Sequence, residues 1–369
     1  MKSRIWQLGM HWDRSGGGAD RYFDDLVRGL GDDVAAAAAF GDASGCFPTA
    51  RSLGPATAPL WKRRAAIRAF GSEMARDPNA LAVSHFALYG RFIGPFVRHG
   101  RHVVHFHGPW SDEAAVEGAG AWAVLAKRLI ERGVYRRAAR CITLSRAFRD
   151  LLVDRFGVSP ARVEVVPGCF DDTRFRRETD RSRERFGMDP GARVIVCVRR
   201  MVRRVGVSEL LEAFEGLVGR HPGVQLHLAG RGPLEREHRE WAALRRLPVF
   251  FHGHVPDADL PAFYRAADVS VVPSQALEGF GLVCIESLAC GTPVFVTPVG
   301  GLPEVVEPLD RGLVLPGSAP GAIAAGLERW LAGEFVLPRG EDCEHYASRN
   351  FSRDRMVNGV RAVYERAVA

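Results

Sequence analysis

Short apolar runs alternate along this chain with helical patterns and glycine-rich turns, a pattern typical of strand–helix–strand units and parallel sheets. The runs fall into two series. The first series comprises Ile5–Gly9, Val34–Phe40, Leu81–Ser84, Val103–Phe106, Cys141–Leu144 and Val163–Val166. The second series comprises Val194–Val198, Val224–Ala229, Val249–Phe251, Val269–Val272, Val294–Val296 and Leu313–Leu315. The sequence therefore predicts an α/β protein with two Rossmann-like halves.

A polar and charged stretch, Asp171–Gly191, separates the two series and lacks a sustained apolar face. We interpret it as the crossing between two domains, residues 1–171 and 172–350, with a short helix in the crossing. A last amphipathic helix is expected over about residues 351–369, where it packs back on the first domain. Its apolar face is predicted from residues at helical spacing, Met356, Val360, Val363 and Tyr364.

The composition sets the class of protein. Since 47% of the 369 residues are apolar, the chain can bury substantial cores. No apolar run approaches the ~20 residues of a membrane span, and the start of the chain lacks a signal-peptide core. We therefore expect a cytoplasmic protein. The seven cysteines are odd in number and never spaced C-x-x-C, which predicts free thiols rather than disulfides or a zinc site.

The net charge of +7 fits a nucleic acid, an anionic membrane or a phosphate-bearing substrate, and charge alone does not choose among them. Lysine occurs only at positions 2, 62 and 127. Any cation that the second half offers in place of a phosphate-binding lysine must therefore be an arginine.

The most informative stretch is Pro273–Pro308, which directly follows a predicted strand. Within it a tight turn of Gly279, Phe280 and Gly281 leads into a helix near Leu282. The first N–H groups of a helix lack backbone partners and the helix dipole is positive there, so the turn suits a diphosphate.

Two glutamates flank this turn with seven residues between them, Glu278 and Glu286. Glu286 lies one turn inside the predicted helix, on the border of its apolar stripe. A carboxylate there needs a partner, and two vicinal ribose hydroxyls would supply one. The other interpretation is that both glutamates only cap and solvate the start of the helix.

This stretch resembles the retaining GT4 glycosyltransferases of GT-B architecture, whose hallmark is E-x7-E followed by G-T-P-V and G-G-x-x-E. The second and third parts read Gly291–Val294 and Gly300–Glu304 here. The resemblance implies two facing Rossmann-like domains with a cleft between them. It also implies that Glu286 binds the nucleotide ribose and that Glu278 faces the donor sugar.

The resemblance extends over most of the chain. Gly16–Gly18 resembles the glycine loop after the first strand, and His107 resembles the family's sugar-contacting histidine. Taken alone, three glycines are a flexible turn as often as a site, and a strand-end histidine is more often structural. Cys197–Phe214 resembles the phosphate loop, Ala229–Pro233 a second glycine turn and Phe251–Val255 the nucleobase loop.

One departure concerns the phosphate loop, where the family has an arginine, then a lysine five residues later, then a glycine. Arg200 and Gly206 hold the first and last positions, but Val205 stands in place of the lysine and Arg199 in place of a preceding glycine. The nearest replacement cation is Arg204, although this arginine and its neighbour also fit solvated surface charges.

The candidate site follows from these motifs. The catalytic residues implied by the resemblance are His107, Glu278 and Arg200. The donor-binding residues implied are Gly17, Gly18, Arg200, Arg204, Gly232, Val255, Gly279, Phe280, Gly281, Leu282 and Glu286. No metal or other cofactor is expected, and Asp257–Asp259, which has the form D-x-D, lies in a polar turn and is not expected to bind one.

The resemblance implies transfer of a hexose-type sugar from a nucleoside diphosphate sugar, UDP before GDP on family frequency alone, to a glycan, lipid-linked or small-molecule acceptor. Alternatives are a GT-B sugar phosphorylase, a sugar-nucleotide epimerase and, more remotely, a basic nucleic-acid-binding protein. Two basic stretches, Trp61–Arg68 and Lys127–Arg140, fit either contact with the inner face of a membrane or the solvated side of helices.

Overall fold

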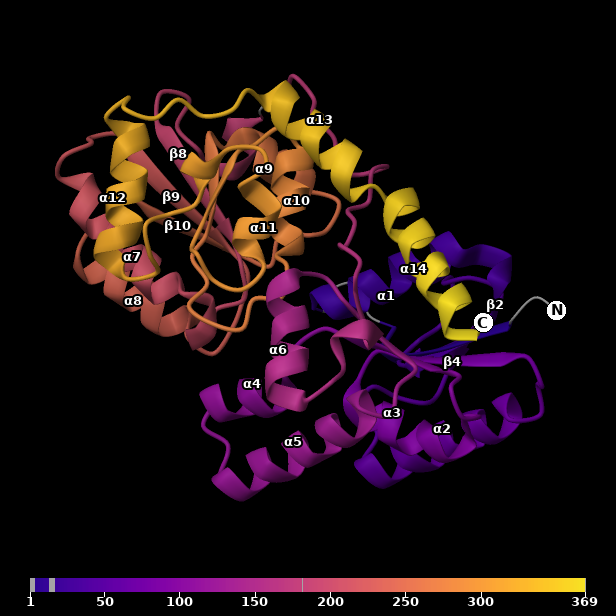
Figure 1. Cartoon of the computed structure of the whole chain (residues 1–369). Helices are drawn as coiled ribbons and strands as arrows, with labels where there is room; N and C mark the ends of the chain where they lie inside the picture. Colours follow the sequence, from indigo (N-terminus) through magenta and orange to yellow (C-terminus); the bar gives the residue numbers. More distant parts are fainter. Residues whose placement is uncertain (1–3, 13–16, 181, 369) are drawn as a thin grey trace. The chain divides into compact units, whose positions relative to one another are not determined.

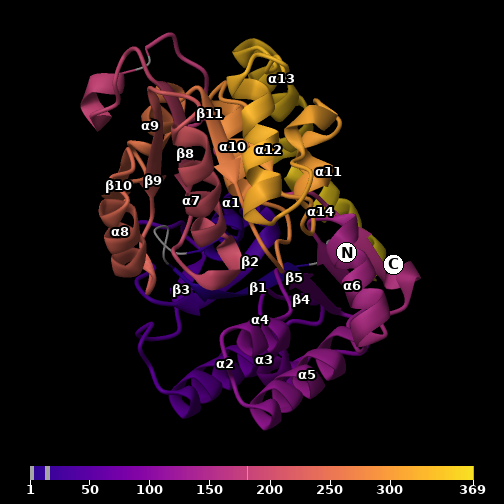
Figure 2. The same cartoon turned by 90° about the vertical axis from the view of Figure 1, so that its left-hand side faces the viewer.

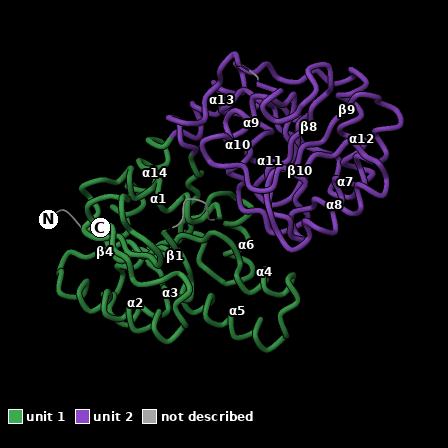
Figure 3. The backbone as a smooth tube through the Cα atoms, turned by 180° about the vertical axis from the view of Figure 1, so that it is seen from behind, with its two compact units in different colours: residues 1–169, 353–369 green, residues 170–352 purple. Residues whose placement is uncertain are grey.

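The computed structural model describes residues 4–12, 17–180 and 182–368. The chain divides into unit 1, Met1–Cys169 with Arg353–Ala369, and unit 2, Phe170–Ser352 (Figure 3). The expected boundaries at 171/172 and 350/351 lie two residues from these divisions.

Unit 1 contains a parallel sheet of seven strands in the order β3-β2-β1-β4-β5-β6-β7. The strands are β1 (Arg4–His11), β2 (Val34–Phe40), β3 (Ala50–Ser52), β4 (Ala80–Ser84), β5 (His102–Phe106), β6 (Arg140–Thr143) and β7 (Val163–Val165). Every run of the first series forms one of these strands. The short edge strand β3 was not predicted, because its sequence, Ala-Arg-Ser, has no apolar pattern.

The helices of unit 1 are α1 (Gly18–Leu30), α2 (Leu60–Met74), α3 (Ala87–Ile93), α4 (Trp110–Val116), α5 (Ala121–Tyr135), α6 (Arg146–Phe156) and α14 (Arg353–Val368). Local signals fix their ends. For example, the Ser145 hydroxyl accepts a hydrogen bond from the Phe148 N–H at the start of α6, and Gly157 ends the helix with φ 68°.

The C-terminal helix α14 packs against α1 and returns the end of the chain to unit 1 (Figure 1). Its predicted apolar residues are all buried. The predicted start at Phe351 was wrong, because this residue ends the preceding helix, and Ser352 has an extended backbone that separates the two helices.

Unit 2 contains a parallel sheet of five strands in the order β10-β9-β8-β11-β12. The strands are β8 (Arg193–Val198), β9 (Val224–Ala229), β10 (Val249–Gly253), β11 (Val269–Val272) and β12 (Val294–Val296). The predicted strand Leu313–Leu315 was wrong. Only Val314 bridges to Val296, and Pro316, which has no N–H to donate, follows directly.

The helices of unit 2 are α7 (Val207–Val218), α8 (Glu235–Leu244), α9 (Leu260–Ala266), α10 (Leu282–Ala289), α11 (Leu302–Val306), α12 (Pro320–Leu331) and α13 (Gly340–Phe351). Helices α7 and α12 pack side by side over the sheet (Figure 2). In both units most buried strand residues are apolar, as expected for parallel strands covered on both faces, with polar exceptions such as Gln7, His105 and His227.

Each sheet changes its direction of strand order at one place, between β1 and β4 in unit 1 and between β8 and β11 in unit 2. Open α/β sheets bind ligands beyond the carboxyl ends of the strands at such a switch point. The loops that follow these four strands are therefore the first places to look for a site.

Candidate active site

In unit 2 the loop after β11 leads through the predicted glycine turn into α10. Gly281 precedes the helix with φ 84°, and no side chain caps the first turn of α10. Phe280 is buried and packs its ring against Phe351 at a centroid distance of 5.6 Å. The first N–H groups of α10 thus lie next to a rigid turn, an arrangement suited to a phosphate.

The loops around this turn approach each other at backbone distance, which only glycine allows. A Cβ at Gly206, before α7, would meet the Pro273 carbonyl oxygen at 1.9 Å. A Cβ at Gly300 would meet the Glu278 carbonyl oxygen at the same distance. Both glycines also have positive φ. The backbone of the candidate site is therefore fixed by contacts that no other residue would permit.

Glu278 is held in a buried polar cluster. Its carboxylate accepts a short hydrogen bond from Arg199 and a 2.8 Å bond from the Ser274 hydroxyl. The Arg199 guanidinium also donates to the Ser274 oxygen at 3.0 Å, and both charged side chains are 12% exposed. Burial raises the pKa of Glu278, but the charge and hydrogen bond of Arg199 outweigh it, so the pKa lies below its ordinary value.

The phosphate loop after β8 presents three arginines in different settings. Arg199 is buried against Glu278, Arg200 is exposed and Arg204 is half-buried. The positive charge of Arg204 also contributes to the low pKa of Glu278, which places this guanidinium near the carboxylate. Val205, in the lysine position, is only 4% exposed and packs inward.

Glu286 lies in the second turn of α10 and is 5% exposed. The Tyr264 hydroxyl donates to its carboxylate at 3.5 Å, close to the outer limit of a hydrogen bond. Glu286, at the border of the apolar stripe, is thus buried and has a polar contact with Tyr264. Its predicted role in ribose binding stays a prediction.

The remaining residues predicted in unit 2 lie at the same edge of the sheet. Gly232, after β9, packs on the loop after β8, since a Cβ there would meet the Met201 carbonyl oxygen at 2.3 Å. Val255 follows β10 and is buried. Gly279 and Leu282 are half-buried around the turn. Leu277 has φ 55°, a costly conformation for a leucine, directly before Glu278.

In unit 1 the candidate residue His107 follows β5 and belongs to a cluster of stacked rings. Its Nε2 lies 3.0 Å from Nδ1 of His85, which follows β4. His105 stacks on His85 at a centroid distance of 4.3 Å, and Tyr22 of α1 packs edge-on against His107 at 5.1 Å. The switch point of the unit 1 sheet therefore holds a cluster of aromatic side chains that can form hydrogen bonds.

Burial keeps these histidines uncharged. It lowers the pKa of His107 to about 4, and the pKa values of His85 and His105 lie well below the ordinary value of 6.5 because of burial and mutual repulsion. At neutral pH a ring of this kind acts through its lone pair and its N–H group rather than through charge.

The predicted loop residues of unit 1 are only partly described. Gly17 and Gly18 are exposed at the start of α1, whereas Gly16 lies outside the described residues. The two aspartates of the D-x-D sequence form ion pairs with arginines, Asp257 with Arg174 and Asp259 with Arg185.

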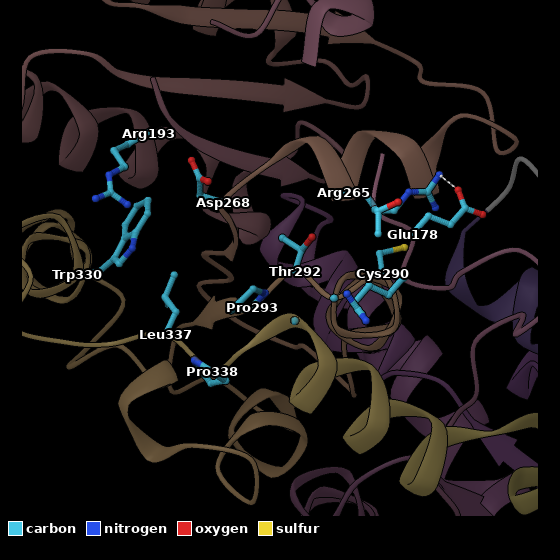
Figure 4. Close-up of a pocket in the computed structure, with 14 residues that line it drawn as sticks. Glu178, Arg193, Arg265, Asp268, Cys290, Thr292, Pro293, Trp330, Leu337 and Pro338 are labelled. Atoms are coloured by element: carbon cyan, nitrogen blue, oxygen red, sulfur yellow. Dashed lines mark ion pairs between the residues drawn. The ribbon is translucent and has the colours of Figure 1, made fainter. Parts of the chain in front are cut away.

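A cavity of about 480 Å³ lies at the other edge of the unit 2 sheet (Figure 4). Arg193 at the start of β8 and Thr292, just before β12, line it, so it lies at the amino ends of the strands. Arg265 and Glu178 in its wall form an ion pair at 2.8 Å. It is separate from the candidate site after β11.

Two models of known families match this chain one after the other. Residues 16–174 match Glycosyltransferase Family 4, and residues 178–350 match Glycosyl transferases group 1. The chain belongs to the group 1 glycosyltransferase family. The predicted glycosyltransferase family is confirmed.

The curated relatives match this chain over only part of their own length. A D-inositol 3-phosphate glycosyltransferase of Acidothermus cellulolyticus is 34% identical over 65% of this chain and 56% of its own length. Mannosylfructose-phosphate synthase of Agrobacterium fabrum is 33% identical over 46% of this chain and 40% of its own. The chain spans about half the length of the curated relatives it matches.

Solved structures confirm the predicted GT-B fold. Sucrose-phosphate synthase from Thermosynechococcus elongatus matches with a TM-score of 0.79 at 24% identity, over 99% of both chains. HepE from Anabaena, solved with UDP, matches with a TM-score of 0.80 at 18% identity, over 98% of this chain and all of that one.

The structure adds residues that the sequence interpretation left without a role. Arg199 was noted only as a replacement for glycine, and His85, Gln7, Tyr22 and Tyr364 were not singled out as site residues. His85 carries the one signal that was available, since it follows a strand end as His107 does.

Proposed function

We propose that this glycosyltransferase moves a hexose-type sugar from a UDP-sugar to an acceptor hydroxyl with retention of anomeric configuration. The observation that carries the proposal is the glycine turn between Glu278 and Glu286, beyond β11 at the switch point of unit 2. Beside it, the loop after the neighbouring strand β8 supplies arginines for a diphosphate. HepE, which shares the fold, was solved with UDP and with UDP-glucose, and this supports UDP as the nucleotide of the donor.

The proposed chemistry is the departure of a diphosphate. Arg200, Arg204 and the first N–H groups of α10 stabilise the leaving phosphate as the anomeric carbon becomes oxocarbenium-like. Glu286 holds the ribose, and His107 of unit 1 accepts a hydrogen bond from the sugar. Because the matched unit 1 motifs offer no carboxylate as a covalent nucleophile, we favour attack by the acceptor on the face that the phosphate leaves.

Calorimetric titration with UDP, GDP and UDP-glucose tests the donor. UDP and UDP-glucose should bind more tightly than GDP, and at 100 times the dissociation constant either should stabilise the protein by about 2.7 kcal/mol. Absence of binding by every nucleoside diphosphate would overturn the proposal. Proton NMR of the product then tests retention, since a product with the opposite anomeric configuration from the donor would refute it.

Two other reactions are separated by the same assay. A phosphorylase would consume glycan and inorganic phosphate to give a sugar phosphate, and an epimerase would convert the nucleotide sugar without any acceptor. Binding to nucleic acid would weaken steeply with salt and be indifferent to UDP. The glycosyl transfer proposal requires a new glycosidic bond that forms only when donor and acceptor are both present.

A lipid-linked acceptor is favoured by exposed side chains on unit 1. Trp61 on α2 is 68% exposed, and Trp122 and Leu129 on α5 are 85% and 61% exposed. Both helices pack against α3 (Figure 1). Exposed cations on the same helices are Lys62, Arg64, Arg68 and Arg132. Tryptophan with arginine and lysine is the pattern of peripheral membrane contact, although no helix among the described residues is long and apolar enough to cross a bilayer.

A further inference from the structure

A chain of buried hydrogen bonds runs from His107 through unit 1 to the C-terminal helix. His107 Nε2 lies 3.0 Å from His85 Nδ1, and His85 Nε2 lies 2.9 Å from the Gln7 side-chain oxygen. The Gln7 amide nitrogen donates to the Tyr364 hydroxyl at 3.1 Å. Gln7, His85 and Tyr364 are each at most 3% exposed, so water does not compete for these bonds.

The amide of Gln7 gives this chain a direction. An amide oxygen only accepts, so the His85 Nε2 that faces it must carry the proton. A neutral imidazole has one N–H group, which leaves His85 Nδ1 as an acceptor. The bond between the two histidines then requires that His107 donate from Nε2. By elimination, Nδ1 of His107 carries a lone pair.

The second arm of the cluster is consistent with the same orientation. Because the Tyr364 hydroxyl accepts from Gln7, its own proton is available to His105 Nε2 at 2.8 Å. His105 Nδ1 then carries a proton that it can donate to the Tyr22 hydroxyl at 3.2 Å. Each ring nitrogen in the network has one role, and none of the three stacked rings needs a charge.

We propose that His85, oriented by Gln7, is a positioning residue that fixes His107 as the Nε2–H tautomer and so presents its Nδ1 lone pair to a hydroxyl of the bound sugar. The tautomer follows from these hydrogen bonds with the Gln7 amide oriented as in the structure, whereas its use on a sugar rests on the proposed function. Among the described residues, no protein group is bonded to Nδ1 of His107, which leaves that atom for a ligand.

This assignment gives the histidine a chemical preference. A lone pair binds a hydroxyl that donates a proton, and it repels a phosphate or carboxylate oxygen. A sugar in which the contacted hydroxyl is replaced by fluorine can accept but not donate. Deoxyfluoro donors should therefore lose the contact as completely as deoxy donors, on the order of tenfold in kcat/KM at one ring position. A fluoro donor that retains the activity lost by its deoxy counterpart would overturn the assignment.

The tautomer itself is measured without any substrate by long-range ¹H–¹⁵N NMR of the imidazole nitrogens, with His107→Gln used to assign the signals. We expect a protonated Nε2 and an unprotonated Nδ1 for His107 in the wild type. The opposite pattern, or averaged nitrogen shifts, would overturn the proposal.

Two variants test the positioning role. His85→Phe keeps a ring in the stack but removes both hydrogen bonds, and Gln7→Met replaces the amide at similar volume. Each should average the His107 nitrogen shifts and lower kcat/KM by on the order of tenfold while UDP affinity is unchanged. If both variants fold, transfer sugar at the wild-type rate and keep the wild-type shifts, His85 is only structural.

A matched control exists in unit 2, where His227 Nδ1 lies 2.9 Å from His252 Nε2. His227→Phe removes the hydrogen bond of a buried histidine in the other unit and should leave the His107 shifts unchanged. Failure of the proposed function is a separate result. In that case no donor is consumed by the wild type, while the NMR result still decides the tautomer.

Discussion

The Arg199 guanidinium and the Glu278 carboxylate form a buried ion pair that joins the loops after β8 and β11. Both side chains are 12% exposed, and Ser274 bonds to both of them. The pair therefore fixes the Glu278 carboxylate, for which the sequence resemblance predicts contact with the donor sugar. The negative charge of Glu278 is thus already balanced by the positive charge of Arg199.

Removing one member of this pair should destabilise unit 2 more than removing both. Arg199→Met leaves a buried carboxylate with less compensation, at a cost of about 3 to 5 kcal/mol. The double variant Arg199→Met, Glu278→Gln should recover much of that loss. Urea unfolding of the single and double variants measures this difference. Equal destabilisation by the single and the double variant would show that the pair is not coupled.

Acid should destabilise unit 1 before it affects the Glu278 pair. Burial lowers the pKa values of His102 and His107 from 6.5 to about 4. The unfolded chain therefore takes up these protons near pH 6.5 and the folded chain does not. Stability is full above pH 6.5 and falls between there and pH 4, by about 1.4 kcal/mol per pH unit for each such histidine.

The contribution of Glu278 is also lost as the pH falls, but at lower pH. Because its folded pKa is lowered, its stabilisation is present above the ordinary carboxyl value and is lost only as the pH falls through the folded pKa. Urea titrations between pH 7.5 and 4.5 separate the two effects. His102→Gln should flatten the slope by one proton, and an unchanged slope would contradict a neutral buried His102.

Glu286→Gln should weaken UDP binding by about 1 to 3 kcal/mol, because the ribose hydroxyls lose a charged acceptor. The residue is 5% exposed, and the amide keeps its volume, so the fold should survive. Calorimetry with UDP and with uridine measures the loss, which should be the same for both. Glu307→Gln, an exposed glutamate after α11, is the control. UDP affinity equal to the wild type would remove Glu286 from the ribose site.

The sequence predicted those parts of the fold and site that depend on neighbouring residues. The glycine turn, the strand before it and the buried Glu286 follow from local periodicity. The pairing of Arg199 with Glu278 joins residues 79 positions apart, and that of Gln7 with Tyr364 joins residues 357 apart. The first pairing depends on the strand order that places β8 beside β11, and the second on how α14 packs in unit 1, neither of which local periodicity specifies. Leu313–Leu315 shows the opposite error, since an apolar run that Pro316 ends forms a single bridge instead of a strand.

Membrane contact through α2 and α5 should depend on apolar side chains and on lipid charge. Trp122→Ser with Leu129→Ser should reduce sedimentation with vesicles of anionic phospholipid by on the order of tenfold, while neutral vesicles bind weakly throughout. Leu244→Ser is the matched control, because Leu244 is equally open to solvent but lies on α8 in unit 2. Vesicle binding that is unchanged by the double variant, or lost equally in the control, would exclude this surface.

Arg204 should take the place of the lysine that the family carries at the position of Val205. Its guanidinium lies near Glu278, while Val205 packs inward at 4% exposure. An arginine can hold two phosphate oxygens at once. Arg204→Ala should therefore weaken UDP binding by about 1.5 to 3 kcal/mol and leave uridine binding little changed.

The neighbouring Arg203 supplies the matched control for this prediction, because it is exposed in the same short turn. Arg203→Ala should bind UDP as the wild type does. Adding Val205→Lys to Arg204→Ala should restore part of the lost affinity, since it returns a cation to the family position. Calorimetric titration with UDP and uridine compares all four proteins. If Arg204→Ala binds UDP as tightly as the wild type, Arg204 does not replace the missing lysine. The diphosphate would then rely on Arg200 and the helix N–H groups.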